Sequence, residues 1–414
     1  MRRRNFIASS SVAFMGLGAM NQVSYGSPDS QVNAEDLRAY LKKILYTREE
    51  IDGWFAGNAF PFSKYNSDLG WLLNNNRFQD GLNNSWSVYT YEGVDGERIM
   101  TNYREKPCRI NTYGNSFTQC HQVSDHETWQ EVLAGHLQEP IRNYGVGGWS
   151  VYQAYLRMLK EEKHKPAKFI IFNIYVDDHL RNLDSWRNIR SQKHPQHIES
   201  TLPFLKVDIA KNRIDEYPNP CPTRESFYQL CDIEQTYKLF KDDFVLKIMI
   251  AHEKSKQANP SKNFESLMQL SKTHGIETRV DTNGTLSEMA DQIHKEAALF
   301  STRKIVEKIE DYAKTNGKKV LYVLSYPSAY IGKYTTDGLR WDQPFIDFLK
   351  GKNLPYVDLA QAHQADLKLF NLGIKEYLGK YFVGHYNPFG NFFCAHTLRD
   401  QVIAMLDPHP KPYL

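Results

Sequence analysis

The sequence predicts an α/β protein: a three-layer α/β/α sandwich with a doubly wound, mainly parallel sheet, an N-terminal extension and a helical insertion. Three strand–turn–helix units follow one another between residues 108 and 175, which indicates a parallel sheet with right-handed crossovers. The apolar run Lys168–Tyr175 is typical of a strand buried on both faces of such a sheet. The irregular, Pro-containing stretch at about 183–291 predicts an insertion that covers one end of the sheet.

The chain before the first core strand forms the N-terminal extension, residues 27–107. Residues 33–43 have the apolar spacing of a helix, and residues 74–84 are an Asn-rich polar loop. Residues 87–103 predict a β-hairpin around the turn Gly93–Gly96. We expect this extension to pack on the edge of the sheet.

Strands and helices then alternate through the hydrolase-like domain, residues 108–414. The predicted strands are 108–113, 141–144, 168–175, 319–324 and 356–358, and the predicted helices are 128–137, 151–162, 286–316 and 391–405. Ligands of open α/β sheets bind at the carboxyl ends of the strands, so the turns after the first three strands are where chemistry is expected.

Composition and charge exclude several classes of protein. Hydrophobic residues make up 41% and charged residues 24%, as in ordinary globular proteins. The formal net charge of +3 is spread along the chain, which gives no case for binding nucleic acid. Aromatic residues, at 13%, suit either a carbohydrate-contacting surface or a large core.

The first 26 residues predict a signal peptide. Arg2, Arg3 and Arg4 precede Asn5-Phe6-Ile7 and a weakly apolar run that is interrupted by Ser and Gly. This pattern resembles a twin-arginine export signal with cleavage near Gly26, and the run is too short for a spanning helix. We therefore expect a periplasmic or secreted protein without stable membrane insertion after signal removal.

Five cysteines allow two disulfides and one free thiol in an oxidising compartment: Cys108, Cys120, Cys221, Cys231 and Cys394. Cys221 and Cys231 are the easiest pair to close because a short loop separates them. The chain has no zinc-type CxxC pair, so we expect neither a structural metal nor a cofactor.

The turns after the first two strands carry a serine and several glycines. Gly114-Asn115-Ser116 places Ser116 on a tight strand-to-helix turn, where it can act as a nucleophile or cap the helix. The second turn, Asn143 to Ser150, holds Gly145, Gly147 and Gly148. A dinucleotide fingerprint would need such glycines after the first strand, so the second turn does not predict a nucleotide site.

The third turn and the C-terminal region supply charged and basic groups. Asp177, Asp178 and Arg181 follow the buried third strand directly. His385 lies in a loop before the last helix, near Asn387, where it can reach the first turn as a general base.

Together these turns resemble the conserved blocks of the SGNH/GDSL hydrolase family, whose fold is flavodoxin-like. Gly114-Asn115-Ser116 matches the first block, Asn143 and Gly148 the second, Tyr175-Val176-Asp177-Asp178 the third, and His385 the fifth. Two positions depart from the family pattern. Asp177 stands where the family has an oxyanion-binding Asn, and Phe382 and Val383 stand where the acid of the triad is expected.

The resemblance implies an esterase that works without a cofactor. Ser116 would be the nucleophile and His385 its base, with the amides of Ser116 and Gly148 holding the oxyanion. We expect Asp177 to be a further catalytic residue. The expected substrate-binding residues are Asn115, Asp178, Arg181 and Asn387. The expected substrate is an acyl ester, O-acetyl above all, on a saccharide or cell-envelope polymer.

Two questions about individual residues stay open at this stage. An ionised Asp177 would repel an oxyanion, so it is either held protonated by Asp178 or paired with Arg181 or a sugar hydroxyl. His385 needs an orienting partner, either a backbone carbonyl or a distant carboxylate such as Asp358 or Asp337.

Three other functions compete with the esterase. An O-acyltransferase would use the same acyl-enzyme, and a carbohydrate-binding protein could keep the fold without catalysis. A sulfate or phosphate ester hydrolase would need metal ligands, for which Asp177, Asp178 and His179 are the one plausible source.

Overall fold

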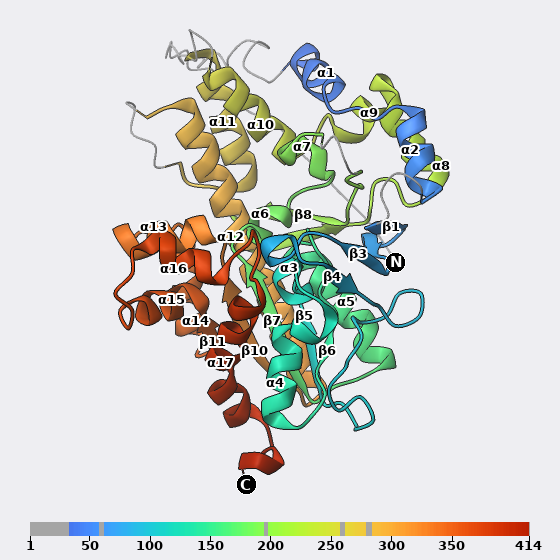
Figure 1. Ribbon diagram of the computed structural model, residues 1–414. Coiled ribbons are helices and arrows are strands. Elements are labelled where there is room, and N and C mark those ends of the chain that lie inside the picture. The colour runs from blue at the N-terminus through green and yellow to red at the C-terminus, as the bar shows by residue number, and fades with distance from the viewer. Residues whose placement is uncertain (1–32, 58–61, 194–197, 257–260, 279–283, 414) are drawn as a thin grey trace, which may run out of the picture.

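The computed structural model describes residues 33–57, 62–193, 198–256, 261–278 and 284–413 (Figure 1). The expected export signal, residues 1–26, lies outside them. The described residues build a three-layer α/β/α sandwich around a five-stranded parallel sheet, as the sequence predicts. Among these residues no helix is both long and apolar enough to span a bilayer.

The central sheet has the order β11-β10-β7-β5-β6. Its strands are β5 (Ile110–Tyr113), β6 (Arg142–Asn143), β7 (Phe169–Tyr175), β10 (Lys319–Ser325) and β11 (Tyr356–Asp358). All neighbours are parallel, and β7 and β10 pair from Phe169 with Lys319 to Tyr175 with Ser325. Numbered along the chain, the strand order is 2-1-3-4-5, which is flavodoxin-like. Its switch point lies between β5 and β7, and a ligand site is therefore expected there.

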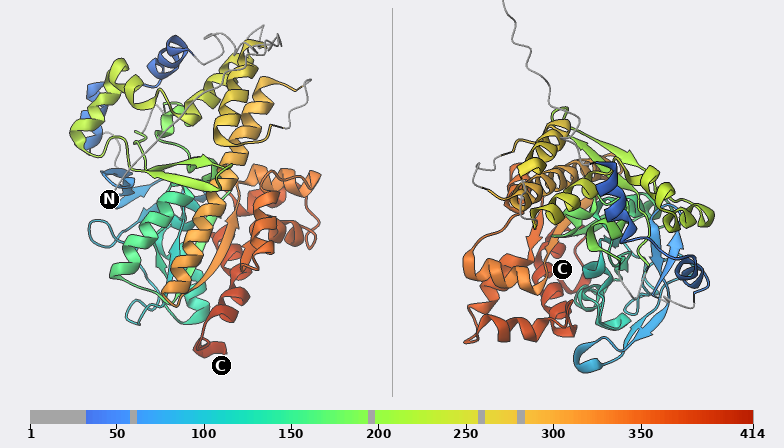
Figure 2. Two further views of the ribbon diagram at one scale, coloured as in Figure 1. Left: turned by 180° about the vertical axis from the view of Figure 1, so that it is seen from behind. Right: turned by 90° about the horizontal axis from the view of Figure 1, so that it is seen from above.

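Helices cover both faces of this sheet because its strands are apolar on both sides. Ile171 of β7 packs with α4 (Trp129–Leu137) and α17 (Pro388–Met405) on one face. Ile170 and Phe172 pack with α5 (Val151–His164), α12 (Leu286–Thr315) and α14 (Gln343–Gly351) on the other. Figure 1 shows α4 and α17 in front of the sheet, and the rear view in Figure 2 shows α5 and α12 behind it.

Shorter helices join these layers. They are α3 (Ser116–Gln119), α6 (Asp178–Arg181), α13 (Ser328–Asp337), α15 (Leu359–Leu367) and α16 (Ile374–Tyr381), with 3-10 turns at Leu82–Asn84, Asp125–Glu127, Tyr228–Cys231 and Lys411–Tyr413. Helix α17 begins three residues before the predicted start. Pro388 fits the first turn of a helix, where no backbone N–H is needed, and Asn387 caps it.

The insertion lies over the carboxyl end of the sheet. It contains α7 (Arg187–Ser191), the antiparallel pair β8 (Phe204–Asp208) and β9 (Arg213–Tyr217), α8 (Arg224–Phe227), α9 (Ile233–Phe240), α10 (Phe244–Ser255) and α11 (Ser261–His274). Figure 1 shows these elements above the end of the sheet at which α3 lies, as does the view from above in Figure 2.

The first two helices of the N-terminal extension pack on this insertion and not on the sheet edge. They are α1 (Ala34–Lys42) and α2 (Arg48–Phe55). Arg38 pairs with Glu234 of α9, and the Tyr40 hydroxyl donates to the Ile189 carbonyl at 2.7 Å. The predicted edge packing is therefore wrong for these helices, because α1 packs against α9 and α10, and α2 packs against β1 (Ser63–Asn66) and the 3-10 turn Tyr228–Cys231.

The predicted hairpin over residues 87–103 is shorter than expected. β4 (Ser87–Tyr89) pairs with β3 (Asn76–Phe78), a strand within the predicted polar loop, and β1 (Ser63–Asn66) pairs with β2 (Gly70–Leu73). Beyond β4 a single bridge joins Tyr91 to Arg98. The ladder ends there because Arg98 turns to the sheet edge, bridging Asn143 of β6 while its guanidinium binds Asp125.

All five cysteines are free thiols. The expected pairing of Cys221 with Cys231 is not formed. The Cys221 side chain is buried in the core of the insertion, and Cys231 lies at the end of a 3-10 turn.

Candidate active site

Ser116 and His385 meet at the switch point of the sheet. Ser116 begins α3 directly after β5, and its Oγ lies 2.8 Å from Nε2 of His385. Both side chains are half-buried. A serine hydroxyl within hydrogen-bond reach of an imidazole is the arrangement that an activated nucleophile needs.

The loop that carries His385 is held in a fixed shape. It joins α16 to α17 through a backbone bridge between Phe382 and Tyr386, and the Val383 N–H donates to the His385 carbonyl at 2.9 Å. Asn387 closes the loop by accepting from the Gly390 N–H and donating to the Lys380 carbonyl. These hydrogen bonds therefore fix the position of His385 relative to Ser116.

The orienting partner of His385 is Gln122, which the sequence did not indicate. Oε1 of Gln122 lies 2.7 Å from the backbone nitrogen of His385 and 3.2 Å from its Nδ1. Asp358 instead binds Arg340 and caps α15, so it is not the substitute acid that the sequence suggested. Asp337 lies at the C-terminal end of α13, and among the described residues the hydrogen-bond partners of the His385 ring are Gln122 and Ser116 instead.

The amide orientation of Gln122 fixes the tautomer of His385. Nε2 of Gln122 donates to the carbonyls of Asp80, at 3.0 Å, and Val383, at 3.4 Å. Oε1 must then face the His385 N–H groups, which requires the ring proton to sit on Nδ1. This leaves the lone pair of Nε2 directed at Ser116, as a general base requires.

A strained turn after α3 brings Gln122 and a second histidine to the site. Cys120 and Gln122 both have left-handed backbone conformations, with φ of 62° and 72°. Such conformations cost free energy in residues other than glycine and cluster at functional sites. The turn places the His121 ring edge-to-face with His385, with 5.0 Å between ring centroids. Seven consecutive residues, 116–122, thus supply the candidate nucleophile, the orienting amide and a neighbouring imidazole.

The charge state of His385 suits a base at neutral pH. Burial lowers its pKa to about 3, and nearby His121 and Arg181 act in the same direction, while Asp80 opposes them. Burial and Arg98 lower the pKa of His121 to about 4. Both imidazoles are therefore neutral at pH 7 in the free protein.

The glycine-rich turn packs directly on the nucleophile helix. A Cβ on Gly145 would lie 2.1 Å from the Gln119 backbone nitrogen, so only glycine allows this approach. The Gly147 carbonyl accepts from the Trp71 indole at 3.0 Å. Because the N–H and C=O of a trans peptide point in opposite directions, this bond turns the Gly148 N–H away from Trp71. That N–H has no hydrogen-bond partner among the described residues and is free to donate to an oxyanion.

The carboxylate of Asp177 is held by two arginines. Its carboxylate binds Arg190 at 2.9 and 3.0 Å and Nε of Arg181 at 2.8 Å. Burial alone would raise the pKa of Asp177, but the two guanidinium groups hold it well below its ordinary value. Asp177 is thus an ionised ion-pair partner of Arg181 and Arg190, and its inclusion among the catalytic groups stays a prediction. The pairing with Arg181 is one of the alternatives that the sequence left open.

Three of the four expected substrate-binding residues are committed to the fold. Asn115, Asp178 and Asn387 are each at most 1% exposed. Asn115 caps α3 and donates to Asp178 at 2.9 Å, while Asp178 also accepts from Arg181 and the Tyr175 N–H. Burial raises the pKa of Asp178 to about 7, although Arg181 acts against this. The interactions of Asn115 and Asp178 fix the turn on which Ser116 stands, and a contact of the three residues with substrate stays a prediction.

Arg181 remains at the site. Its Nη1 donates to Asp178 and, at 3.3 Å, to the carbonyl of Trp149, so the guanidinium links the turn after β7 to that of Gly148. Its charge also lowers the pKa of His385.

The metal ligands considered for a sulfate or phosphate ester hydrolase are not brought together. Nδ1 of His179 lies 2.8 Å from the Thr302 hydroxyl, and its ring packs on Phe345 of α14. In the part of the chain that the structure describes, no group of three or more His, Cys, Asp or Glu side chains could hold a metal ion.

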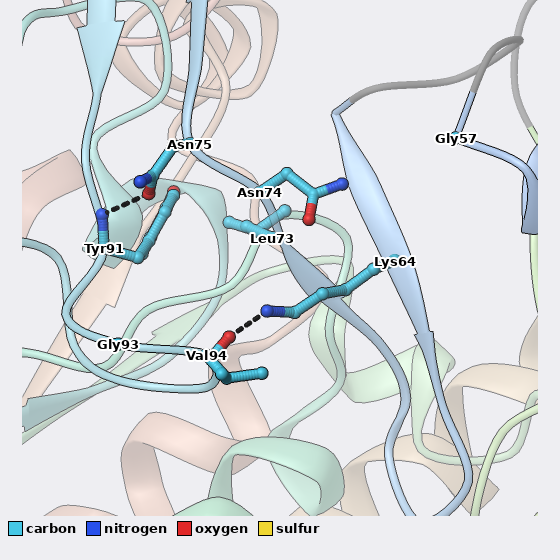
Figure 3. Close-up of a pocket in the computed structure, with 8 residues that line it drawn as sticks. All are labelled: Gly57, Lys64, Leu73, Asn74, Asn75, Tyr91, Gly93 and Val94. Carbon is cyan, nitrogen blue, oxygen red and sulfur yellow. Dashed lines mark hydrogen bonds between the residues drawn. The ribbon is translucent and has the colours of Figure 1, made fainter.

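Two hollows lie near these elements. A mainly apolar groove of about 480 Å³ runs between α13 and α16 and reaches Gly384, next to His385; it is lined by Ser328, Ala329, Gly332, Ile374, Lys375, Leu378, Gly379, Phe382 and Gly384. A second hollow of about 430 Å³ lies in the N-terminal extension, where Figure 3 shows Lys64 bonded to the Val94 carbonyl and Asn75 to the Tyr91 N–H. The Tyr91 hydroxyl accepts a hydrogen bond from Gln119 at 3.0 Å, which links a lining residue of this second hollow to α3.

Comparison with known proteins gives structural likenesses alone. No family model and no curated protein sequence matches the chain. A member of the lipolytic G-D-S-L family from Veillonella parvula aligns over 72% of this chain and 98% of its own, with 12% identity and a TM-score of 0.32. A protein from Lactobacillus plantarum aligns over the same shares, with 11% identity and a TM-score of 0.31. The roles of the side chains therefore rest on the geometry of the site.

Proposed function

We propose that the protein is an exported serine esterase that cleaves an O-acyl ester, such as O-acetyl, on a carbohydrate or cell-envelope polymer. The observation that carries the proposal is the 2.8 Å contact between Ser116 Oγ and Nε2 of a neutral His385 whose Nδ1–H is bonded to Gln122. The partly exposed ring of Tyr175, which stacks on the buried Phe117 beside His385, supports a substrate with sugar rings.

The reaction would follow the two steps of acyl transfer. Ser116 Oγ attacks the ester carbonyl carbon while its proton passes to Nε2 of His385, and the carbonyl π pair moves to the oxygen. The N–H groups of Ser116 and Gly148 stabilise this oxyanion. The imidazolium then protonates the leaving alkoxide, which gives an acyl-enzyme. His385 next takes a proton from water as the water oxygen attacks the acyl carbon. The bond between that carbon and Ser116 Oγ then breaks, the carboxylic acid leaves, and the imidazolium returns the proton to Oγ.

Labelling with a fluorophosphonate probe tests the proposal without knowledge of the natural substrate. We expect covalent labelling of the wild-type protein at Ser116, none of Ser116→Ala, and strongly reduced labelling of His385→Ala. Hydrolysis of acetylated xylan and of p-nitrophenyl acetate, measured by acetate and nitrophenol release, then identifies the ester. Acyl transfer to added saccharide in place of acetate release would identify a transferase. A wild-type protein that resists the probe would contradict the proposal.

A further inference from the structure

We infer that Asp80 supplies the negative charge that stabilises protonated His385 during the reaction, so that two residues share the work of one triad acid. Gln122 fixes the ring, and Asp80 provides the charge from a distance. This inference rests on the proposed function, because it concerns the same reaction. Asp80 lies between β3 and β4 in the N-terminal extension, outside the sheet domain.

Hydrogen bonds tie Asp80 to the partner of the catalytic histidine. Its backbone carbonyl accepts from Nε2 of Gln122 at 3.0 Å, and its Oδ2 accepts from the Tyr89 hydroxyl at 3.1 Å. The same hydroxyl accepts from the Gln122 backbone N–H at 2.7 Å. Asp80, Tyr89 and Gln122 therefore form one network that ends on the ring of His385.

His121 bridges the space between the Asp80 carboxylate and His385. Its Nε2 lies 3.6 Å from Oδ2 of Asp80, and its ring contacts that of His385 edge-to-face. His121 is neutral at pH 7, so the contact is not an ion pair that would cancel the charge of Asp80. A polarisable ring between two charges transmits their attraction better than water, which screens it.

One oxygen of the carboxylate is left without a partner. Oδ1 of Asp80 is buried and accepts no hydrogen bond from the described residues. An unpaired buried carboxylate oxygen is costly, and in a folded protein it calls for a compensating role. A positive charge that forms on His385 only during the reaction would provide that compensation.

The other charged groups around His385 act against its protonation. Arg181, from α6, and His121, from the turn after α3, both lower its pKa, whereas Asp80 raises it. Arg98 acts on the neighbouring His121. Without Asp80 none of these groups would favour the imidazolium, and the first step would be slower.

The test compares the charge at Asp80 in two backgrounds. Asp80→Asn removes the charge and keeps the shape, whereas Gln122→Glu places a carboxylate directly at Nδ1. We expect Asp80→Asn to lower kcat for p-nitrophenyl acetate and the rate of fluorophosphonate labelling about 10-fold or more, with KM little changed. The acid limb of the pH–rate profile should move to lower pH, because the pKa of His385 falls. In the Gln122→Glu background the same substitution should cost less than about 3-fold, because the direct carboxylate replaces the distant one.

Controls separate the inference from its alternatives. Asp95→Asn removes another carboxylate of the extension, which pairs with Lys64, and should leave both rates unchanged. Thermal unfolding checks each variant, and Asp80→Ser gives the same comparison if Asp80→Asn folds poorly. An equal loss in both backgrounds would assign Asp80 a structural role, and no loss in either would assign it none; both results overturn the inference. If the wild type is labelled at Ser116 and Asp80→Asn reacts equally fast, the inference is contradicted but the proposed function is not. Absence of labelling in the wild type contradicts the proposed function as well.

Discussion

Oε1 of Gln122 accepts two hydrogen bonds from His385, one from the backbone N–H at 2.7 Å and one from Nδ1 at 3.2 Å. In a conventional triad a carboxylate occupies this position, and it both orients the imidazole and stabilises its positive charge. A neutral amide can do only the first. The position of Gln122 therefore predicts an enzyme whose histidine is well oriented but weakly basic.

Removal of the orienting amide should slow the reaction without unfolding the protein. Gln122→Ala frees Nδ1 and lets the ring of His385 rotate, so we expect kcat for p-nitrophenyl acetate to fall about 10-fold, the equivalent of one hydrogen bond of about 1.4 kcal/mol. The fluorophosphonate labelling rate should fall in parallel. Turnover equal to that of the wild type would show that the braced loop alone orients the histidine.

The acid limb of the pH–rate profile should lie unusually low. His385 acts as a base only when neutral, and burial, with His121 and Arg181, lowers its pKa to about 3. The neutral form predominates above that value, so kcat/KM should stay constant from pH 8 to about pH 5 and fall only as the pH approaches 3. Circular dichroism at each pH distinguishes titration from unfolding. A midpoint near the ordinary histidine value of about 6.5 would contradict this prediction.

Loss of the charge of Asp177 should affect stability more than rate. Asp177→Asn removes the carboxylate shared by Arg181 and Arg190, while Ser116 and His385 keep their contacts. We expect hydrolysis of a small aryl ester to be kept or raised and the free energy of unfolding to fall. The loss should lie between the roughly 1 kcal/mol of exposed pairs and the roughly 3–5 kcal/mol of buried ones. Denaturant titration and kcat of Asp177→Asn and Asp177→Ala check this, and a large loss of kcat in both would show that the carboxyl group is required for catalysis.

Stability should decline in mild acid. Burial lowers the pKa values of His121 and His179 to about 4 and those of His294, His363 and His385 to about 3. Each binds a proton in the unfolded chain below about pH 6.5 but not in the folded protein, so each removes up to about 1.4 kcal/mol per pH unit as the pH falls.

Two buried carboxyls act in the opposite sense. Burial raises the pKa of Asp178 to about 7 and that of Asp243 to about 6, so between about pH 4 and pH 6 they hold protons in the folded state that the unfolded chain releases. The histidines outnumber them, and Tm should therefore rise from pH 5 to pH 6.5. A Tm that is flat or falls over this range, measured by calorimetry, would contradict the pKa directions of the histidines.

The sequence by itself determined the sheet and pointed to Ser116 and His385 as the candidate pair. The apolar run from Lys168 to Tyr175 could be buried only in a parallel sheet covered on both faces, and the turn around Ser116 had to lie at the carboxyl end of β5. Such features are local, because period, turn chemistry and helix caps depend on residues close together in the chain. The closing helix belongs to the same class, but its cap does not: the sequence predicted a start at residue 391, and only the structure shows that Asn387 caps α17.

Only the tertiary structure decided what surrounds His385. Gln122 precedes it by 263 residues, and nothing in a glutamine next to His121 marks it as the substitute for a triad acid. Its role depends on the left-handed turn at Cys120 and on the carbonyls of Asp80 and Val383, which orient the amide. The charge of Asp177 also depends on the tertiary structure, because the fold places Arg190 beside its carboxylate and so keeps it ionised. Long-range contacts set the direction of a hydrogen bond and the charge of a side chain, and the order of residues along the chain does not specify them.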